Sequence, residues 1–392
     1  MICRALPFIY RRMKTIKSFP QAAFQKKLLK WYQTSKRPLP WRQKKSAYGT
    51  LVSEIMLQQT QIKTVIPYYG RWLKTFPTIQ KLAKAPLRKV LKLWEGLGYY
   101  SRARNLHRTA QTIDRRFQGQ IPSDPEILMM LPGIGRYTAG AIASIAYDQP
   151  VPLVDGNVAR VFSRIFLIKQ DILKPETQKL LYTYASSLVS SKQAGNFNQA
   201  LMELGALICT PALPECSLCP VRSLCCAYQN GVQETLPVRS KGPQKKKVFL
   251  QAALLTHQNK ILVQERPAKG IWGGLWELPN RRVNGEHEPR KFKRYLEKQY
   301  RVSLAPTFKR LSLMKRELTH LSVVIEPFQF LVKKTALKQS EKLRWILKPH
   351  LKSISCPVPY QQILQNHFES KVLGSDPDLT PSKGSDPAQP NG

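Results

Sequence analysis

The amino-acid sequence predicts two domains, a mainly α N-terminal domain and an α+β C-terminal domain. Its 392 residues, 42% of them hydrophobic, suffice for two separate cores. From Phe19 to about Cys225, apolar residues recur at helical spacing, and no convincing alternating strand pattern interrupts them. Beyond residue 247, short runs rich in apolar and β-branched residues flank turn-like segments, which is typical of strands.

The N-terminal domain is predicted to span residues 18–230 and to consist of short helices. Leu51, Val52 and Ile55 illustrate the helical spacing of its apolar residues. Proline and glycine residues, which end helices or permit tight turns, divide the segment into short pieces. They stand at Pro38, Pro40, Pro67, Pro77, Pro86, Gly96, Gly98, Pro122 and Pro132.

The C-terminal domain is predicted to span residues 248–366. Two apolar runs, at 248–255 and 260–263, flank a turn-like segment and predict a hairpin. Residues 289–300 are predicted to form one helix. Residues 321–330 are rich in β-branched and aromatic side chains and predict a further strand. This mixture makes the domain α+β.

Three segments lie outside these patterns. Residues 1–17 form a basic extension without the long apolar stretch and cleavage site of a secretory signal, and Met13 is an alternative start. Residues 231–247 are polar and basic and predict a linker. The tail, 367–392, is rich in Ser, Pro and Gly and is predicted to be disordered. No run approaches the roughly 20 apolar residues of a membrane span, so we expect a soluble, unsecreted protein without a membrane partner.

The charge of the chain points to a polyanionic partner. With 63 Lys and Arg against 24 Asp and Glu, the formal net charge is +39. Nucleic acid is the leading candidate, and a generally basic surface is the alternative. Residues 1–53 contain 13 Lys or Arg and no carboxylate, so Glu54 is the first acid of the protein. A lone acid after such a run is a candidate functional residue.

Four cysteines of the N-terminal domain lie in one short segment, 209–225, and predict a metal site. They are Cys209, Cys216, Cys219 and Cys225. Closely spaced thiolates outside an oxidising compartment converge on a cation that neutralises their repulsion. Two separated CxxC pairs would favour zinc, whereas one compact run with unequal gaps can hold a [4Fe–4S] cluster. Cys226 is a spare thiol beside the last of them.

The segment Leu131-Pro-Gly-Ile-Gly135 fits a helix-hairpin-helix motif. Gly133 and Gly135 permit a tight turn, and the N–H groups that begin the next helix can bind a phosphate oxygen. The small residues that follow, 137–146, permit close helix packing. Alone, the motif also fits an ordinary turn between helices, but the net charge favours a nucleic-acid contact.

Asp155 and Asn157 flank a glycine at the start of another apolar helix. Asp and Asn both cap helices well, so a capping role is the plain alternative to a functional one. The position of Asp155, 20 residues after Gly135, favours function.

Several motifs, in order along the chain, resemble the helix-hairpin-helix DNA glycosylases. They are Glu54-Ile-Met-Leu-Gln-Gln-Thr60, Gly96-Leu-Gly-Tyr-Tyr-Ser-Arg102, Leu131-Pro-Gly-Ile-Gly-Arg-Tyr137, Val154-Asp-Gly-Asn157 and the four cysteines. The resemblance covers about residues 20–230. Within that superfamily the chain is similar to the MutY-type adenine DNA glycosylases. The resemblance implies excision of adenine mispaired with 8-oxoguanine or guanine in double-stranded DNA.

The resemblance also implies catalytic residues. Glu54 matches the proton donor to adenine N7, and Asp155, with Asn157 beside it, the carboxylate that faces the sugar. The apolar surroundings of Glu54 favour its neutral acid, and N–H groups at a helix start favour the Asp155 anion. Tyr137 stands where endonuclease III-type enzymes carry a lysine nucleophile. Because a phenol forms no Schiff base, we expect a monofunctional enzyme without strong strand cleavage.

Contacts to DNA are implied in the same way. The resemblance places Arg42 and Gln199 around the extruded adenine, and Gln59, Thr60 and Tyr99 inside the duplex. Core packing is the alternative for Tyr99. Arg102 supplies a phosphate-binding charge, as Gly133 and Gly135 supply N–H groups. The four cysteines are implied to hold a [4Fe–4S] cluster that serves folding and DNA docking rather than catalysis.

The C-terminal domain resembles a Nudix-like module through Trp272-Gly-Gly-Leu-Trp-Glu-Leu-Pro279. The predicted helix 289–300 offers mostly Lys and Arg, so the magnesium-binding Nudix helix is lacking. The resemblance implies a reader of 8-oxoguanine, with Thr319 and His320 at the oxidised base.

The expected protein is thus a monomeric base excision repair enzyme of the bacterial type, in the cytoplasm at the nucleoid. An endonuclease III-like pyrimidine glycosylase is one alternative, disfavoured by Tyr137 and the reader domain. A catalytically silent DNA-binding protein is another, disfavoured by Glu54 and Asp155.

Overall fold

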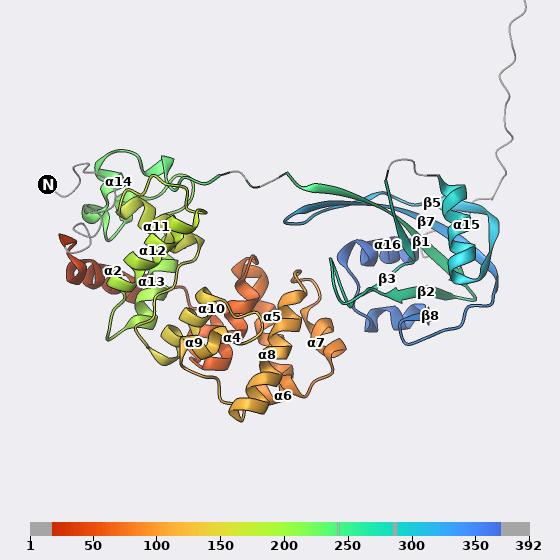
Figure 1. Cartoon of the computed structure of the whole chain (residues 1–392), viewed down its shortest axis with the longest axis horizontal. Helices are drawn as coiled ribbons and strands as arrows, with labels where there is room; N and C mark the ends of the chain where they lie inside the picture. Colours follow the sequence, from red (N-terminus) through yellow and green to blue (C-terminus); the bar gives the residue numbers. More distant parts are fainter. Residues whose placement is uncertain (1–17, 241, 243, 285–287, 370–392) are drawn as a thin grey trace, which may run out of the picture. The chain divides into compact units, whose positions relative to one another are not determined.

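The structure, a computed structural model, describes residues 18–240, 242, 244–284 and 288–369 (Figure 1). The chain divides into two compact units between Pro243 and Gln244, inside the segment expected to be a linker. The expected N-terminal extension, 1–17, and most of the expected tail, 370–392, lie outside the described residues.

The first unit is built from helices, and its described residues contain no strand. The helices are α2 (Gln21–Ser35), α3 (Pro40–Gln43), α4 (Ala47–Leu57), α5 (Ile62–Thr75), α6 (Ile79–Ala83), α7 (Leu87–Trp94), α8 (Ser101–Phe117), α9 (Pro125–Met129), α10 (Arg136–Ala141), α11 (Gly156–Ile165), α12 (Pro175–Leu188), α13 (Ala194–Leu207) and α14 (Cys226–Gln229). None of them is long and apolar enough to cross a membrane, nor is any other helix of the described residues.

Proline explains why many of these helices are short. Pro40 is the first residue of α3 and Pro86 the N-cap of α7, positions at which the missing N–H costs nothing. The prediction that Pro67 ends a helix is wrong, because α5 continues through it. Val65 and Trp72 are buried on that helix, and their burial outweighs one lost hydrogen bond.

Two helical groups carry the interior of this unit. In one, α2, α11, α12 and α13 enclose a core that includes Phe24, Phe162 and Phe197, and Figure 1 shows α11, α12 and α13 close together. In the other, α4 is buried on every side, since each residue of 49–56 is buried. A helix buried all round carries even its polar side chains into the interior. Glu54 is therefore an interior residue.

The predicted helix-hairpin-helix is present as α9, a turn and α10. Gly133 adopts φ +78°, in the left-handed region that favours glycine, so the turn requires a glycine there. A Cβ on Gly140 would lie 2.5 Å from the carbonyl oxygen of Pro152, so this glycine permits the close packing expected of the small residues. After α10 the chain continues as a π-helical segment, η1 (Ile142–Ala146).

The second unit is built around one mixed eight-stranded sheet. Its strands are β1 (Lys246–His257), β2 (Lys260–Glu265), β3 (Trp276–Glu277), β4 (Asn280–Val283), β5 (Val302–Arg310), β6 (Met314–Glu317), β7 (Leu321–Thr335) and β8 (Leu343–Leu347). The order β3-β2-β1-β7-β5 places the parallel pair β1 and β7 at the centre. The other three strands pair antiparallel, β4 with β1, β6 with β7 and β8 with β2.

Apolar side chains cover both faces of this sheet. Along β1, Leu254 belongs to a core closed by α16 (Val358–Glu369), and Leu255 to a core closed by α15 (Pro289–Tyr300). The predicted hairpin, helix and third strand are all present, although β7 is five residues longer than expected. The tail prediction is wrong for residues 367–369, which belong to α16 because its buried face continues to His367.

Candidate active site

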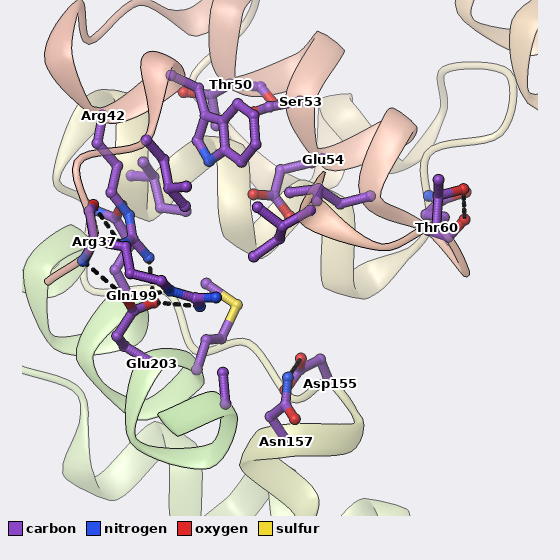
Figure 2. Close-up of a pocket in the computed structure, with 18 of the residues that line it drawn as sticks. Arg37, Arg42, Thr50, Ser53, Glu54, Thr60, Asp155, Asn157, Gln199 and Glu203 are labelled. Atoms are coloured by element: carbon purple, nitrogen blue, oxygen red, sulfur yellow. Dashed lines mark hydrogen bonds and ion pairs between the residues drawn. The ribbon is translucent and has the colours of Figure 1, made fainter. Parts of the chain in front are cut away.

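One pocket of about 440 Å³ lies among α4, α10, α11 and α13, a volume suited to a small ligand (Figure 2). The structure brings eight of the predicted site residues to its wall. They are Arg42, Glu54, Gln59, Thr60, Tyr137, Asp155, Asn157 and Gln199. Figure 2 shows Glu54 and Asp155 on opposite sides of the cavity. The two carboxyl groups share a single cavity, as the predicted chemistry requires.

Glu54 reaches the pocket from the buried helix α4, and its exposed fraction is only 6%. The Tyr137 hydroxyl donates a hydrogen bond to Glu54 Oε2 at 2.7 Å. Burial raises the pKa of Glu54 to about 7, although that hydrogen bond opposes the rise. The charge of Asp155 across the pocket adds to it. A carboxyl group with this pKa can hold a proton near neutral pH.

Asp155 is the N-cap of α11, so the capping alternative describes its local geometry correctly. Its Oδ1 accepts a hydrogen bond from the Val158 backbone N–H at 2.7 Å. Its Oδ2 accepts one from Asn157 Nδ2 at 3.0 Å. Burial raises the pKa of Asp155, whereas these donors favour the anion and act against burial. Unlike Glu54, Asp155 therefore has a donor on each carboxylate oxygen.

Asn157 connects Asp155 to the cysteine loop through Arg160, a residue that sequence reasoning missed. Its Oδ1 accepts a hydrogen bond from Arg160 Nη2 at 2.9 Å. Arg160 Nε in turn donates to the carbonyl oxygen of Cys209 at 2.7 Å. The contact could have been predicted from the spacing of the two residues, because Arg160 lies one helical turn after Asn157 and side chains one turn apart are neighbours.

An ion-pair network around the buried Glu203 forms another wall of the pocket, and sequence reasoning missed two of its members, Glu203 and Arg37. Arg42 Nη2 pairs with Glu203 Oε2 at 2.8 Å, and Arg42 Nε donates to Gln199 Oε1 at 3.2 Å. Arg37 Nε pairs with Glu203 Oε1 at 2.7 Å. Dashed lines in Figure 2 mark these contacts. Glu203 could have been identified from the sequence in the same way as Glu54, because both are acidic residues within an apolar helix.

Replacing Glu203 with Gln is expected to destabilise the fold by about 3 kcal/mol, because it breaks a buried ion pair from one side. Burial raises the pKa of Glu203, but hydrogen bonds from Arg37 and Arg42 outweigh burial and lower the pKa to about 2. The anion therefore contributes stability above about pH 4.5, which is lost as the pH falls toward 2. Urea unfolding at pH 7 measures the effect, with Glu176→Gln, at an exposed position of α12, as the control. Equal loss in both variants would contradict the assignment.

Two turns carry the residues that are expected to enter the duplex. Gln59 and Thr60 line the cavity itself, in the turn after α4. Tyr99 lies in the turn before α8 with 46% of its surface exposed, so the core-packing alternative does not describe it. The expected phosphate-binding role of Arg102 does not fit its surroundings. Only 8% of this side chain is exposed, because its guanidinium group hydrogen-bonds to protein oxygens.

The four predicted cysteine ligands line one small hollow beside α11 and α13. Arg164 Nη1 donates to Cys209 Sγ at 3.2 Å. Burial and the mutual repulsion of the thiolates raise the pKa of Cys219 to about 12 and that of Cys225 to about 11. A bound cationic group would lower these pKa values, because it stabilises the thiolate, and the thiolate is the form that binds a metal. Cys226 does not line the hollow. In the described part of the chain, no three His, Cys, Asp or Glu side chains converge closely enough to hold a single metal ion.

In the second unit, Thr319 and His320 are exposed in the turn between β6 and β7. The acid of α15, Glu297, accepts a hydrogen bond from the Leu304 backbone N–H. Glu277 of the Trp272–Pro279 motif is buried and forms an ion pair with Arg266. These acids therefore have structural partners.

The fold and the pocket define a class, the base excision DNA repair proteins. Residues 52–186 match the model of the HhH-GPD superfamily base excision DNA repair proteins, and residues 251–366 match that of the NUDIX domain. The solved structure of a thermostable thymine-DNA glycosylase is 28% identical, with a TM-score of 0.50. That match covers 54% of this chain and 97% of the other.

Similarity to curated relatives identifies one family within this class. The adenine DNA glycosylase of Buchnera aphidicola subsp. Baizongia pistaciae is 35% identical over 347 residues, which cover 87% of this chain and 95% of that relative. The adenine DNA glycosylase of Mus musculus is 49% identical over 311 residues, or 66% of this chain and 60% of the relative. The chain belongs to the adenine DNA glycosylase family. It spans 60–62% of the length of the mouse and rat relatives.

Proposed function

We propose that the chain is a DNA N-glycosylase that excises adenine, opposite 8-oxoguanine or guanine, from double-stranded DNA in base excision repair. The observation that carries the proposal is the pair Glu54 and Asp155 on opposite sides of one pocket with different hydrogen-bond partners. Family membership supports the same activity.

The two carboxyl groups meet the needs of N-glycosidic hydrolysis. Adenine leaves poorly as an anion, so Glu54 protonates N7 of the base as the bond to the sugar breaks. Positive charge then develops on the sugar, and the Asp155 anion stabilises it, as one of two carboxyl groups does in glycoside hydrolysis. Water completes the reaction. The duplex must first release the nucleotide, because the bond is inaccessible within the base stack.

Hydrogen bonds to Arg42 and to the backbone orient the Gln199 amide for recognition of adenine. Gln199 Oε1 accepts from Arg42, and its Nε2 donates to the Gly195 carbonyl oxygen at 3.2 Å. One N–H and one lone pair of the amide remain for a purine edge, which in adenine offers one acceptor and one donor. The fixed orientation of Gln199 thus favours adenine.

Two observations at the pocket wall support hydrolysis without strand cleavage. Tyr137 cannot form a Schiff base, and its hydroxyl group already binds Glu54. No lysine belongs to the described lining of the pocket. The proposed enzyme is therefore monofunctional.

We also propose that Cys209, Cys216, Cys219 and Cys225 hold a [4Fe–4S] cluster. When bound, it would supply positive charge to the thiolates and a covalent link across the loop, in support of folding and DNA docking. Purified protein should show broad visible absorption and about four irons per chain. Cys219→Ser is expected to lose both, while Cys226→Ser keeps both. A colourless wild-type protein with one zinc would contradict the proposal.

For the second unit we propose recognition of 8-oxoguanine by the exposed pair Thr319 and His320. Family membership and the structural partners of its acids support a reader rather than a nucleotide hydrolase. We further propose that the chain acts as a monomer at the nucleoid, where double-stranded DNA lies.

The excision rate is expected to fall as the pH rises through about 7. Glu54 must be protonated to act as the acid, and its pKa of about 7 makes the anion dominant above that pH. Tyr137→Phe removes a hydrogen bond that favours the anion, so it should move this decline to higher pH. Single-turnover rates between pH 5 and 9, at constant ionic strength, measure both. A rate that increases through pH 7 would exclude Glu54 as the acid.

Excision assays on defined duplexes test the proposed function. Duplexes with adenine opposite 8-oxoguanine should release free adenine and break only after heating in alkali. Spontaneous breaks at oxidised pyrimidines, with a borohydride-trapped adduct, would indicate the endonuclease III-like alternative. Binding without release of any base would indicate a silent DNA-binding protein.

A further inference from the structure

We propose that Arg102 is a positioning residue that joins two DNA-facing turns, residues 58–60 and 97–99, into one rigid insertion unit. The inference rests on the proposed function, in which Gln59, Thr60 and Tyr99 enter the duplex. Arg102 lies in the first turn of α8, and its side chain is directed into the protein, with 8% exposed.

The two terminal nitrogens of Arg102 divide their hydrogen bonds between the turns. Nη1 donates to three carbonyl oxygens at the end of α4, those of Ile55, Met56 and Gln58. Nη2 donates to the carbonyl oxygens of Leu97 and Gly98, at 3.0 and 3.2 Å, and to the Thr60 hydroxyl oxygen at 3.1 Å. One planar group thus contacts both turns.

The same contacts fix the strained backbone of each turn. Gln59 has φ +55° and Tyr99 has φ +47°, a conformation that is unfavourable for residues other than glycine. Arg102 binds the carbonyl oxygen of the residue immediately before each of them, Gln58 and Gly98. Because that carbonyl belongs to the peptide plane that sets φ of the next residue, the guanidinium group holds both residues in their projecting conformation.

Aromatic contacts extend the connection to the Tyr99 side chain. The Arg102 guanidinium carbon lies 5.3 Å from the ring centroid of Tyr99 and 5.3 Å from that of Trp94. Trp94 Nε1 donates to the Gly98 carbonyl oxygen at 3.0 Å, so the turn is held from two directions. Tyr99 is exposed yet anchored, as an inserting side chain needs to be.

This arrangement distinguishes Arg102 from a phosphate ligand. Its Nη groups bind protein oxygens, and its Nε atom is buried. Removing a phosphate contact lowers the slope of log affinity against log salt by about 0.9, whereas removing a buried positioning residue leaves that slope unchanged. The effect of Arg102 should instead appear after binding, in the extrusion of the base.

The main test compares Arg102→Gln with Arg115→Gln, a control at an exposed position on the same helix. Duplexes carry 2-aminopurine opposite 8-oxoguanine, and its fluorescence rises when it leaves the stack. At saturating protein, Arg102→Gln is expected to slow that rise at least tenfold with an unchanged salt slope, and Arg115→Gln to extrude the base as wild type does. Unchanged extrusion, or a reduced salt slope with normal extrusion, would overturn the inference.

A double-mutant cycle tests the connection without altering Arg102, in case its variants fold poorly. The effects of Gln59→Ala and Tyr99→Ala on extrusion should be non-additive if the turns insert as one unit. Additive effects in the wild-type background would overturn the inference. Adenine excision by the wild-type protein is scored separately, so loss of the proposed function is distinguishable from failure of this inference.

Discussion

Glu54→Gln is expected to reduce the single-turnover rate of adenine excision by about 1,000-fold, the middle of the range for loss of a general acid. The amide preserves the shape of the side chain and can still accept the Tyr137 hydrogen bond. It cannot donate a carboxylic acid proton to the purine. Because the side chain is buried and its ionisation is already opposed, the variant should fold at least as stably as the wild type above pH 7.

The measurement separates catalysis from binding. Excision is followed under saturating enzyme, and affinity for the mismatched duplex is measured with the same preparation. Affinity should remain within a few-fold of wild type. Glu176→Gln, on the exposed surface of α12, serves as the charge-matched control and should excise normally. Excision by Glu54→Gln at a rate within tenfold of wild type would remove Glu54 from the mechanism.

Asp155→Asn is expected to slow excision by about 100- to 1,000-fold, the range for loss of one electrostatic contact to a transition state. Asparagine caps helices as well as aspartate does, so it can still accept from the Val158 N–H. The free energy of unfolding should therefore change little. What is lost is the negative charge that faces the developing cation on the sugar.

Asp155→Ala separates the two roles of this residue. It removes both charge and cap, so it should match Asp155→Asn in rate but lose about 1 kcal/mol more stability. Asp124→Asn provides a control, because Asp124 is likewise an N-cap aspartate, on α9. Normal excision by Asp155→Asn would reduce this residue to a helix cap.

Much of the fold could be predicted from local patterns. The helix at 289–300 and the hairpin after the linker follow from periodicity and turn composition, which are properties of neighbouring residues. Pro67 shows the limit, since a local rule predicts a helix end there. The buried face of α5 decided otherwise, and burial depends on residues far away in sequence.

Likewise, only some residues of the candidate site could be predicted from local patterns. Glu54 and Asp155 stand in motifs, so their convergence could be expected. The contacts of Glu203 with Arg37 and Arg42 join residues 166 and 161 positions apart, and no local pattern links them. For Arg102, composition indicates only a cation. Whether a cation faces solvent or helix-end carbonyl groups depends on how α4 and α8 pack.

The cap that Asp155 forms on α11 ties reactivity to local thermal motion. Each time the first turn of that helix frays, the Val158 amide loses its acceptor and the carboxylate loses its fixed position. Protection of this single amide against deuterium exchange thus reports how often the catalytic geometry is intact.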